Sequence, residues 1–174
     1  GFFLRAAKKR GWTVTGIEPN PTARNLANLK HPNSVLDASA LHTLPEKSFD
    51  VITLWHVLEH LPNLEDDIIK LQKLLKPNGR IVVAVPNYNS FDALYFKGFW
   101  AAYDVPRHLW HFSQQSISIL FSKVQMKLDA THPLVMDSFY VSFLSNKLKT
   151  GSLRILNSLW VGFLSNIKAL RSGE

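Results

Sequence analysis

Acidic residues follow two apolar segments early in the sequence, each where a β-strand is expected to end. Glu18 closes the segment 12–18, and Asp37 and Ala38 close the segment 34–38. The carboxyl ends of parallel strands meet at one edge of a sheet, where nucleotide-like ligands bind. There the first carboxylate could accept hydrogen bonds from ribose hydroxyls and the second from an adenine amine. The structural alternative is a turn stabilised by the acid itself.

Histidines that could move a proton occur in two short segments. His56 and His60 follow the apolar run 49–55, whereas His108 and His111 lie in an aromatic stretch that ends HLWHFS. Because imidazole titrates near neutral pH, His56, His108 or His111 could serve as a general base toward a hydroxyl acceptor. A hydrogen bond to nearby backbone is the structural alternative for each of them.

A metal site is not expected from these histidines. His56 and His60 are four residues apart, but the segment reads H-V-L-E-H, without the acid that directly follows the first histidine in zinc proteases. The sequence has no cysteine, which excludes thiolate ligands, a disulfide framework and a cysteine nucleophile. We therefore predict that the protein uses no metal.

The aromatic segment 87–112 interrupts the alternation of helices and strands, as expected of an insertion over the strand ends. Its Asp104 and Arg107 could bind a polar or anionic substrate, or they could pair with each other. Its aromatic side chains could line an apolar acceptor pocket or form a small hydrophobic cluster under a long loop.

The elements that must position these residues alternate as in an open α/β sheet. Strands are expected at 12–18, 34–38, 49–58, 80–86 and, at an edge, 126–134. Helices are expected at 1–10, 21–30, 64–76 and 114–124, with Gly11 closing the first and Asn20 capping the second. We predict an α/β fold with a Rossmann-like, open and mostly parallel sheet and flanking helices.

The end of the sequence is predicted to be helical, with Gly151 between two helices. An apolar stripe at near-heptad spacing runs along the second helix: Leu153, Leu156, Trp160, Phe163, Ile167 and Leu170. Such a stripe is typical of a core or a dimer face, and a membrane-surface helix is the other alternative. We predict a Rossmann-like domain at 1–145, with the insertion 87–112 inside it, and a helical C-terminal extension at 146–174.

Length and charge limit the classes of partner. The 174 residues suffice for one domain with a hydrophobic core. The net charge is +7, but the cations are scattered apart from a cluster at 5–10, so no nucleic-acid partner is expected. No apolar run reaches about 18 residues, so we expect no transmembrane span. The lack of cysteine fits a reducing cytosol, and we predict a cytoplasmic protein.

Four segments, in their order and separations, resemble class I S-adenosylmethionine-dependent methyltransferases: GIEPN, LDA, SFDVITLWHVLEHLPN and LLKPNGRIVVAVPN. The similarity points to the branch that includes ubiquinone-biosynthesis O-methyltransferases and many bacterial relatives. The segment PRHLWHFS, at 106–113, resembles a signature of that branch at the position of its substrate loop. The resemblance covers residues 1–145.

The resemblance implies S-adenosylmethionine as the cofactor and methyl transfer to a small-molecule acceptor, at a hydroxyl, by in-line displacement. In such enzymes the acid after the second strand holds the ribose, the Asp-Ala pair faces adenine, and the end of the fourth strand lines the methionine part. The cofactor-binding residues implied here are Gly1, Glu18, Asp37, Ala38, Leu54, Trp55 and His56.

The family's first strand and most of its glycine-rich loop would precede Gly1, which could be the last glycine of that loop. The sheet is therefore expected to lack its central strand. We expect these 174 residues alone to bind the cofactor poorly and to be inactive by themselves, because the loop for the methionine end is missing.

Three alternatives remain open. A nucleotide-dependent oxidoreductase also has an acid after its second strand, but needs G-x-G-x-x-G before the first helix. A degenerate, non-catalytic domain would serve in association through residues 151–170, a surface that could also form a homodimer or a peripheral membrane contact. Nucleic-acid methylation is disfavoured because the N-P-P-Y-like tetrapeptide is missing.

Overall fold

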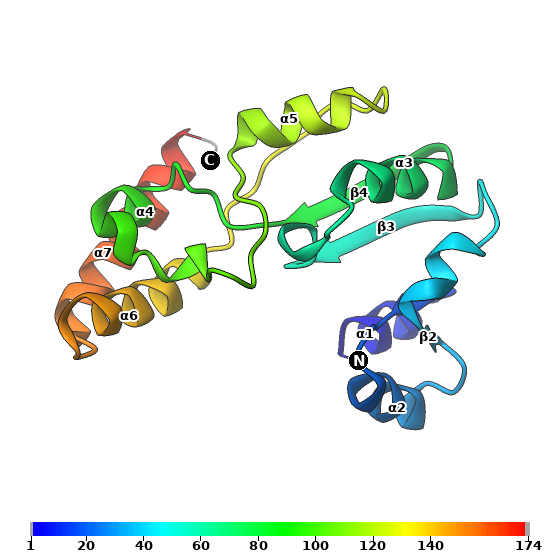
Figure 1. Cartoon of the computed structure of the whole chain (residues 1–174), viewed down its shortest axis with the longest axis horizontal. Helices are drawn as coiled ribbons and strands as arrows, with labels where there is room; N and C mark the ends of the chain where they lie inside the picture. The colour runs from blue at the N-terminus through cyan, green and yellow to red at the C-terminus, as the bar shows by residue number, and fades with distance from the viewer. Residues whose placement is uncertain (1, 173–174) are drawn as a thin grey trace. The chain divides into compact units, whose positions relative to one another are not determined.

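The computed structural model describes residues 2–172, which belong to two compact units (Figure 1). Unit 1 is Gly1–Asp50 with Lys73–Asn78, and unit 2 is Val51–Gln72 with Gly79–Glu174. The boundary passes through the strands β3 (Phe49–Trp55) and β4 (Leu75–Ala84). Each unit is described below by itself.

Unit 1 is built around a pair of short parallel strands. In chain order its elements are α1 (Phe2–Lys9), β1 (Gly16–Ile17), α2 (Pro21–Lys30), β2 (Val35–Leu36) and the 3-10 helix η1 (Ala38–His42). Gly16 lies opposite Val35 in the parallel ladder. The predicted cap of α2 is confirmed, because the Asn20 side chain accepts a hydrogen bond from the Ala23 N–H.

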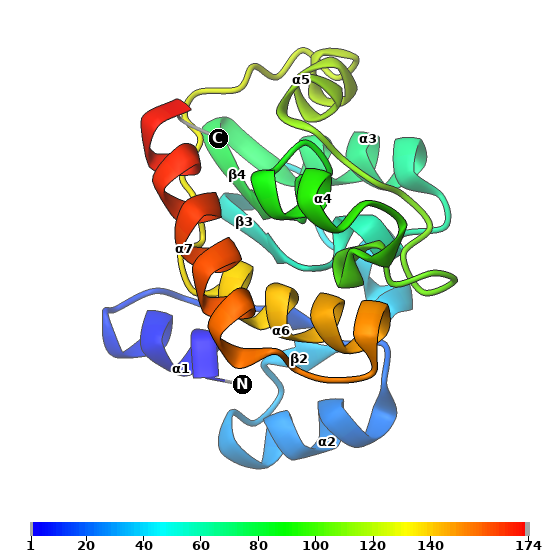
Figure 2. The same cartoon turned by 90° about the vertical axis from the view of Figure 1, so that its left-hand side faces the viewer.

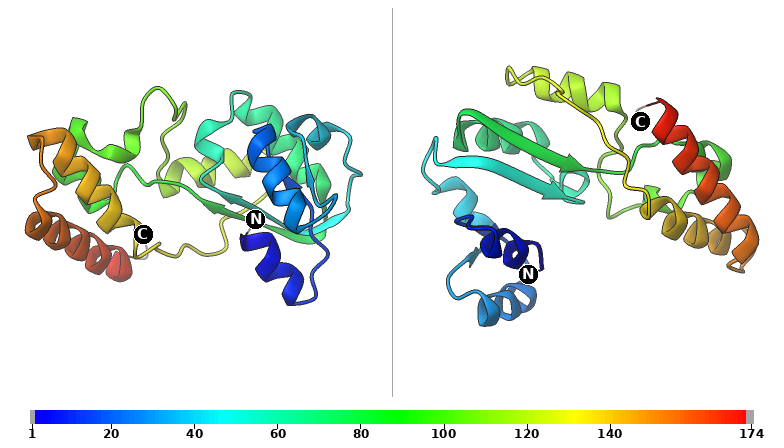
Figure 3. Two further views of the ribbon diagram at one scale, coloured as in Figure 1. Left: turned by 90° about the horizontal axis from the view of Figure 1, so that it is seen from below. Right: turned by 180° about the vertical axis from the view of Figure 1, so that it is seen from behind.

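Strands β3 and β4 form a second hydrogen-bonded pair, and they run side by side in Figure 3. The Ser48 N–H donates to the Leu74 carbonyl at 2.9 Å, and the His56 N–H donates to the Ala84 carbonyl at 3.0 Å. The partner numbers rise together along both strands, which is the pattern of a parallel pair. The described residues thus contain two separate parallel pairs of strands.

The remaining elements belong mainly to unit 2. They are, in order, η2 (Leu58–His60), α3 (Leu64–Leu74), α4 (Phe91–Phe96), η3 (Lys97–Phe99), η4 (Ala101–Tyr103), α5 (Gln114–Ser122), α6 (Asp137–Thr150) and α7 (Ile155–Ser172). Ser113 caps α5 in a capping box with Ser116, as the predicted helix start requires. Gly151 ends α6 at φ 76°, a left-handed conformation that favours glycine.

Several predicted boundaries were wrong. The first strand is limited to Gly16–Ile17, because residues 12–15 have no partner strand in the described part of the chain. Helix α3 ends at Leu74, and β4 follows at once from Leu75 instead of starting at residue 80. Residues 126–134 form no strand. There Asp129 pairs by its side chain with Arg80 of β4 at 3.0 Å, and no backbone ladder forms.

The two ends of the insertion 87–112 are joined by a β-bridge, and the residues between them are mainly helical. Asn87 and Phe112 form an isolated parallel bridge, and the Tyr88 N–H donates to the Phe112 carbonyl at 3.0 Å. Between these ends lie α4, η3 and η4. The segment is therefore a folded subdomain with its own helices, where the sequence suggested an irregular loop.

The insertion shares one hydrophobic core with the last two helices, which lie beside α4 in Figure 2. Ala93, Phe96, Trp100 and Ala102 of the insertion pack with Val161 of α7. The contact is also polar, because the buried Asp92 accepts hydrogen bonds from Trp100 Nε1 and Ser165 Oγ, both at 2.7 Å. Helix α7 is thereby attached to the insertion by buried contacts of both kinds.

The predicted division of the chain at 145/146 stays a prediction, although both residues lie within the single helix α6. Helices α6 and α7 pack closely against each other and against α4. Within residues 2–172, none of the helices combines the length and the apolar content that crossing a bilayer requires.

We predict that Gly162→Ala destabilises the protein, because a Cβ there would lie 2.6 Å from Cδ1 and 3.0 Å from Cα of Phe139 on α6. Overpacking costs about 1–3 kcal/mol, which outweighs the roughly 0.5–1 kcal/mol that alanine gains in a helix. The urea midpoint followed by far-ultraviolet circular dichroism should fall. Gly98→Ala is the control, since its Cβ would meet nothing within 4 Å. Equal midpoints for the two variants would contradict this account of the α6–α7 contact.

Candidate active site

Glu18 follows β1 directly, at the carboxyl end of the parallel pair in unit 1. Its backbone N–H continues the ladder to the Leu36 carbonyl at 3.0 Å. Its Oε1 accepts the Asn20 N–H at 2.9 Å, which ties the carboxylate to the start of α2. Oε2 has no partner among the described residues. The side chain can therefore still accept hydrogen bonds from a ligand at this edge.

Asp37 follows β2 and forms the turn that was its structural alternative. Its Oδ1 accepts hydrogen bonds from both the backbone N–H and the hydroxyl of Ser39, at 3.0 and 2.9 Å. Its Oδ2 pairs with Arg24 Nη1 at 3.0 Å. The Ser39 hydrogen bonds, followed by the Arg24 charge, hold the pKa of Asp37 below its usual value. Ala38 is the first residue of η1.

Arg24 links the two strand ends within unit 1. Besides Asp37, its guanidinium binds the carbonyl oxygens of Glu18 and Pro19 at 2.8 and 3.2 Å. The Arg24 guanidinium therefore contacts both the backbone after β1, at Glu18, and the carboxylate of Asp37 after β2. Sequence reasoning did not identify Arg24, because its position on α2 gave no sign of which carbonyls it would reach.

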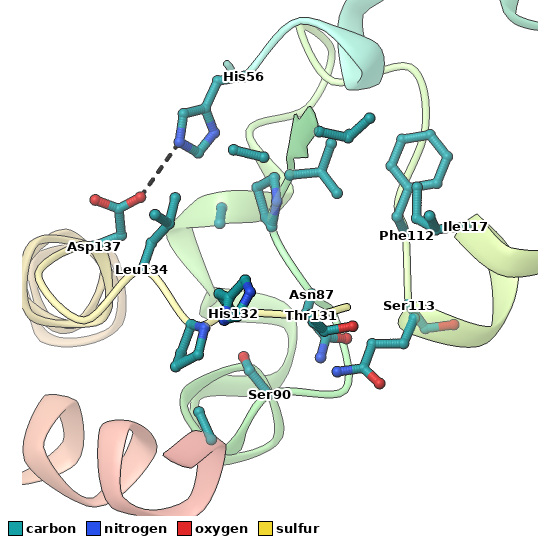
Figure 4. Close-up of a pocket in the computed structure, with 18 of the residues that line it drawn as sticks. His56, Asn87, Ser90, Phe112, Ser113, Ile117, Thr131, His132, Leu134 and Asp137 are labelled. Carbon is teal, nitrogen blue, oxygen red and sulfur yellow. Dashed lines mark ion pairs between the residues drawn. The ribbon is translucent and has the colours of Figure 1, made fainter. Parts of the chain in front are cut away.

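A cavity of about 1040 Å³ lies within unit 2. Figure 4 shows part of its lining, with His56 and Asp137 at one side and Asn87, Ser90, Ser113 and Thr131 around it. The lining comes from the end of β3, the strand β4, the insertion, the start of α5, the segment 126–134 and helix α6. Its size suits a drug-sized or metabolite-sized ligand.

His56 stands in a strained backbone conformation where β3 ends. Its φ is 51°, in the left-handed region that is uncommon for residues other than glycine, although histidine, like asparagine and aspartate, adopts it more often than most. The hydrogen bond from its N–H to Ala84 keeps it in the ladder with β4. Such strain is maintained only where surrounding contacts fix it, and here it turns the imidazole away from the strand direction.

The ring of His56 lies between two carboxylates. Nδ1 is 3.3 Å from Glu59 Oε1, and Nε2 is 3.3 Å from Asp137 Oδ2. A carboxylate oxygen only accepts, so both contacts favour the doubly protonated imidazolium. The hydrogen bond to Glu59 is the main cause that raises the pKa of His56, and Asp137 adds to it against the opposing effect of burial.

Glu59 connects β3 to the insertion. Its side chain is fully buried, and its Oε2 has no partner among the described residues. Its backbone carbonyl accepts the N–H groups of Leu109 and Trp110 at 2.8 and 3.3 Å. One residue of η2 therefore anchors the PRHLWHFS segment with its main chain and faces His56 with its side chain.

His108 is almost buried and lines the cavity. Its Nδ1 is 2.8 Å from the Ala102 carbonyl, which can only accept, so that nitrogen carries the hydrogen. Nε2 lies 4.0 Å from Glu59 Oε1 and 3.8 Å from Asp104 Oδ2, too far for hydrogen bonds. In the neutral ring Nε2 therefore keeps its lone pair.

His111 lies beside His108, with ring centroids 6.5 Å apart, but does not line the cavity. Its Nε2 contacts the Tyr103 carbonyl at 2.9 Å, and its ring packs edge-on against Tyr103. The structural alternative for His111 is thus realised. His56 and His108 are brought to the same buried carboxylate, Glu59.

Glu59, His60 and His108 are the described residues whose ligand atoms lie close enough to hold a metal ion, within 4.8 Å of one another. His60 Nδ1 contacts the Arg107 carbonyl at 2.9 Å, so its Nε2 is the nitrogen that remains. The expectation of a metal-free protein stays a prediction.

Arg107 and Asp104 pair with each other. This is one of the two alternatives that the sequence left open, the other being contact with a polar or anionic substrate. Arg107 Nη2 and Nε lie 2.7 and 3.1 Å from Asp104 Oδ1. This contact raises the pKa of Arg107 further above its usual value. Both residues also line the cavity, so the pair can still face a polar part of a ligand.

The predicted cofactor residues are divided between the units. Glu18, Asp37 and Ala38 belong to unit 1, whereas Leu54, Trp55 and His56 belong to unit 2. Leu54 is 8 % exposed and does not line the cavity, but Trp55 and His56 do. Gly1 lies outside the described residues. The cofactor role of each of these residues remains a prediction.

Asp137 is the site residue that sequence reasoning missed. It is the first residue of α6, and its carboxylate contacts His56. Sequence reasoning gave no residue of this helix a role in the site. A signal was present, since Asp137 is the only acid between Asp129 and Glu174. Nothing in the local pattern, however, indicated which histidine it would meet.

Comparisons with known proteins concern the family and the fold. The sequence model of a family described as methyltransferase domain matches residues 1–131 of the 174. The ubiquinone biosynthesis O-methyltransferase of Pseudomonas entomophila is 31 % identical over 96 residues, covering 51 % of this chain and 41 % of that protein. The mitochondrial enzyme of the same description from Schizosaccharomyces pombe is 28 % identical, covering 48 % and 34 %. The chain thus matches about two fifths or less of the length of these curated relatives.

Solved structures share the fold. An S-adenosylmethionine-dependent methyltransferase from Archaeoglobus fulgidus aligns with a TM-score of 0.57 at 18 % identity, covering 88 % of this chain and 75 % of that one. One from Thermotoga maritima, described as a possible histamine N-methyltransferase, aligns with a TM-score of 0.54 at 21 % identity, covering 63 % and 53 %. The four-segment resemblance, the parallel strand pairs and the family match over most of the sequence agree: this chain belongs to the class I S-adenosylmethionine-dependent methyltransferases.

Proposed function

We propose that the protein transfers the methyl group of S-adenosylmethionine to a hydroxyl of a small-molecule acceptor bound in the unit 2 cavity. The observation that carries the proposal is the state of His108. Its Nδ1 contacts the Ala102 carbonyl, its Nε2 makes no hydrogen bond among the described residues and carries the lone pair whenever the ring is neutral, and its ring lines the cavity. The similarity to ubiquinone-biosynthesis O-methyltransferases supports a hydroxyl acceptor.

The residues of unit 1 suit the nucleoside part of the cofactor. Glu18 retains a free carboxylate oxygen at the edge where such ligands bind, which suits the two ribose hydroxyls. Asp37 suits adenine less well, because Oδ1 already accepts two hydrogen bonds and Oδ2 faces Arg24. Oδ2 keeps one acceptor position, so Glu18 is the residue on which we place the greater weight.

When bound, S-adenosylmethionine supplies an electrophilic methyl group on a sulfonium. The task of the chain is then to hold the acceptor oxygen in line and to take up its proton. We assign proton uptake to Nε2 of His108, because this nitrogen can accept without first losing a hydrogen. The buried Glu59 carboxylate nearby would stabilise the imidazolium that results.

We assign His56 a binding role instead of that of a base. Its two carboxylate neighbours favour the protonated ring, and a protonated imidazole has no lone pair with which to accept a proton. As a cation at the cavity wall it would attract an oxygen-rich acceptor. His111, whose Nε2 contacts the Tyr103 carbonyl and whose ring does not line the cavity, has a structural role in this proposal, as a ring packed beside Tyr103 and His108.

We expect His108→Gln to lower kcat by about 10²–10⁴ while changing the affinity for S-adenosylhomocysteine little, since a general base contributes in this range. The assay is methyl transfer by the full-length protein across small hydroxylated metabolites and matched amines, with mass spectrometry of the product. His111→Gln is the matched control and should stay near wild type. Methylation of amines alone would contradict O-methylation, and an unchanged kcat for His108→Gln would contradict its role as base.

We expect Glu18→Gln in the full-length protein to weaken S-adenosylhomocysteine binding by about tenfold or more. Loss of a hydrogen bond to a charged group costs roughly 1.5–3 kcal/mol, which corresponds to this change. Isothermal titration calorimetry gives the dissociation constants. Glu46→Gln, an exposed acid of the same unit, is the control. If both variants bind as tightly as the wild type, the ribose assignment is wrong.

We predict that Glu59→Gln lowers the pKa of His56, and that Asp137→Asn lowers it by less, because the Glu59 hydrogen bond is the larger cause of the raised value. Imidazole proton shifts followed by NMR against pH measure both. A raised folded-state pKa means that protonated His56 stabilises the fold fully below pH 6.5, and that this contribution is lost as pH rises through the raised pKa. No change in either variant would refute the carboxylate–imidazole–carboxylate arrangement.

A further inference from the structure

Helix α7 is oriented opposite to the usual pattern of a surface helix. Its buried side consists of small and polar residues, namely Ser158, Val161, Gly162, Ser165 and Asn166. Most of the apolar stripe is turned outward, which excludes a core role for it and leaves the dimer face and the membrane-surface helix as alternatives. A water-exposed amphipathic helix normally buries its apolar side.

Hydrogen bonds fill the buried side of α7. Asn146 of α6 donates to Asn157 Oδ1 at 3.0 Å and to Ser158 Oγ at 2.8 Å. Ser165 donates to the buried Asp92, and Ser138 Oγ donates to the Gly162 carbonyl at 3.2 Å. Small residues and hydrogen bonds between closely packed helices are how helices associate where the surroundings are apolar. Among the described residues, Asn166 Nδ2 of α7 and Ser142 Oγ of α6 are buried without a hydrogen-bond partner, whereas the side chains named above are paired. The polar side of α7 is thus the one that packs against α6 and the insertion, which leaves its apolar side outward.

The outward face is large and apolar. The exposed fractions are 84 % for Leu156, 59 % for Trp160, 49 % for Phe163 and 65 % for Leu170. Ile155 and Leu159 of the same helix are 59 % and 44 % exposed. A continuous apolar face of this kind on a soluble domain marks an interaction surface. Trp160 and Phe163 lie with ring centroids 6.3 Å apart, so two aromatic rings share the middle of it.

The sequence around this face is rich in cations. Between Asp137 and Glu174 the sequence contains five cations and no acidic residue: Lys147, Lys149, Arg154, Lys168 and Arg171. All five are exposed. Arg154 directly precedes α7 and Arg171 lies in its last turn, whereas the Lys168 ammonium lies over the Phe91 ring of α4 and the residue lines the cavity. The apolar stripe is thus bounded at both ends by positive charge, a pattern that suits a helix lying in the interface of an anionic bilayer.

We propose that the α6–α7 pair binds the surface of an anionic membrane, with the outward face of α7 lying in the headgroup region. The charge argues for lipid over a second copy of the chain, because two such faces would bring like charges together. Aromatic rings between cationic ends match the depth profile of a bilayer interface, where rings sit at headgroup level and long cations extend to the phosphates.

The test is flotation of the full chain with vesicles of phosphatidylcholine alone and of phosphatidylcholine mixed with phosphatidylglycerol. We expect binding to the mixed vesicles, decreasing with salt. Trp160→Ala with Phe163→Ala should weaken the partition coefficient by about tenfold or more. Lys147→Gln with Lys149→Gln should weaken it by about fivefold for each cation removed. These side chains are exposed, so circular dichroism should show unchanged folding.

Matched control variants show whether a loss of vesicle binding is specific to the outward face of α7 and the lysines of α6. Ile119→Ala on α5, 55 % exposed, is compared with Leu156→Ala. Lys8→Gln with Lys9→Gln, in α1 of unit 1, is compared with the α6 lysine pair. Equal losses in test and control variants, equal binding to neutral vesicles, or no binding would overturn the proposal. So would a dimer in sedimentation velocity that Trp160→Ala with Phe163→Ala dissociates, if the wild type does not bind vesicles.

Discussion

Burial of the Glu59 carboxylate beside the end of β3 is the constraint on which the arrangement of unit 2 depends. A buried carboxylate is stable only with hydrogen-bond partners or a cation nearby, and His56 supplies one on its Nδ1 side. The main chain of the same residue holds Leu109 and Trp110, so the position of the insertion follows from that of η2. The main chain of the short 3-10 helix η2 thereby fixes the distance between His56 and His108. Flexible side chains contribute little to this distance.

Much of the fold could be predicted from local patterns, because caps and turns are determined by a few adjacent residues. Asn20 before Pro21 and Ser113 before α5 mark helix starts through one side-chain hydrogen bond each, and Gly11 and Gly151 mark helix ends through positive φ. Strand lengths were less predictable. A β-branched run becomes a strand only where a neighbouring strand is available, which is why residues 12–15 remain without regular structure.

The candidate site was predicted only in part, because its long-range contacts have no local signature. The three histidines look alike in the sequence, and their partners differ: Asp137, far along the chain, for His56, and the nearby carbonyls of Ala102 for His108 and of Tyr103 for His111. The two carbonyl contacts depend on how the insertion folds, which no local pattern shows. The sequence left the orientation of α7 open for a related reason. Apolar periodicity shows that a helix has two faces, but it does not show which one the rest of the fold will cover.

The hydrogen bonds of Asp92 have a consequence for communication within unit 2. They join Trp100, on the segment that carries His108, to Ser165 on α7, and each is 2.7 Å long and buried. Broken singly, either would leave a buried charge without one of its partners, so the two helical regions tend to move together. Ligands that bind the cavity and contacts made by α7 would then be thermodynamically linked, and such linkage acts equally in both directions.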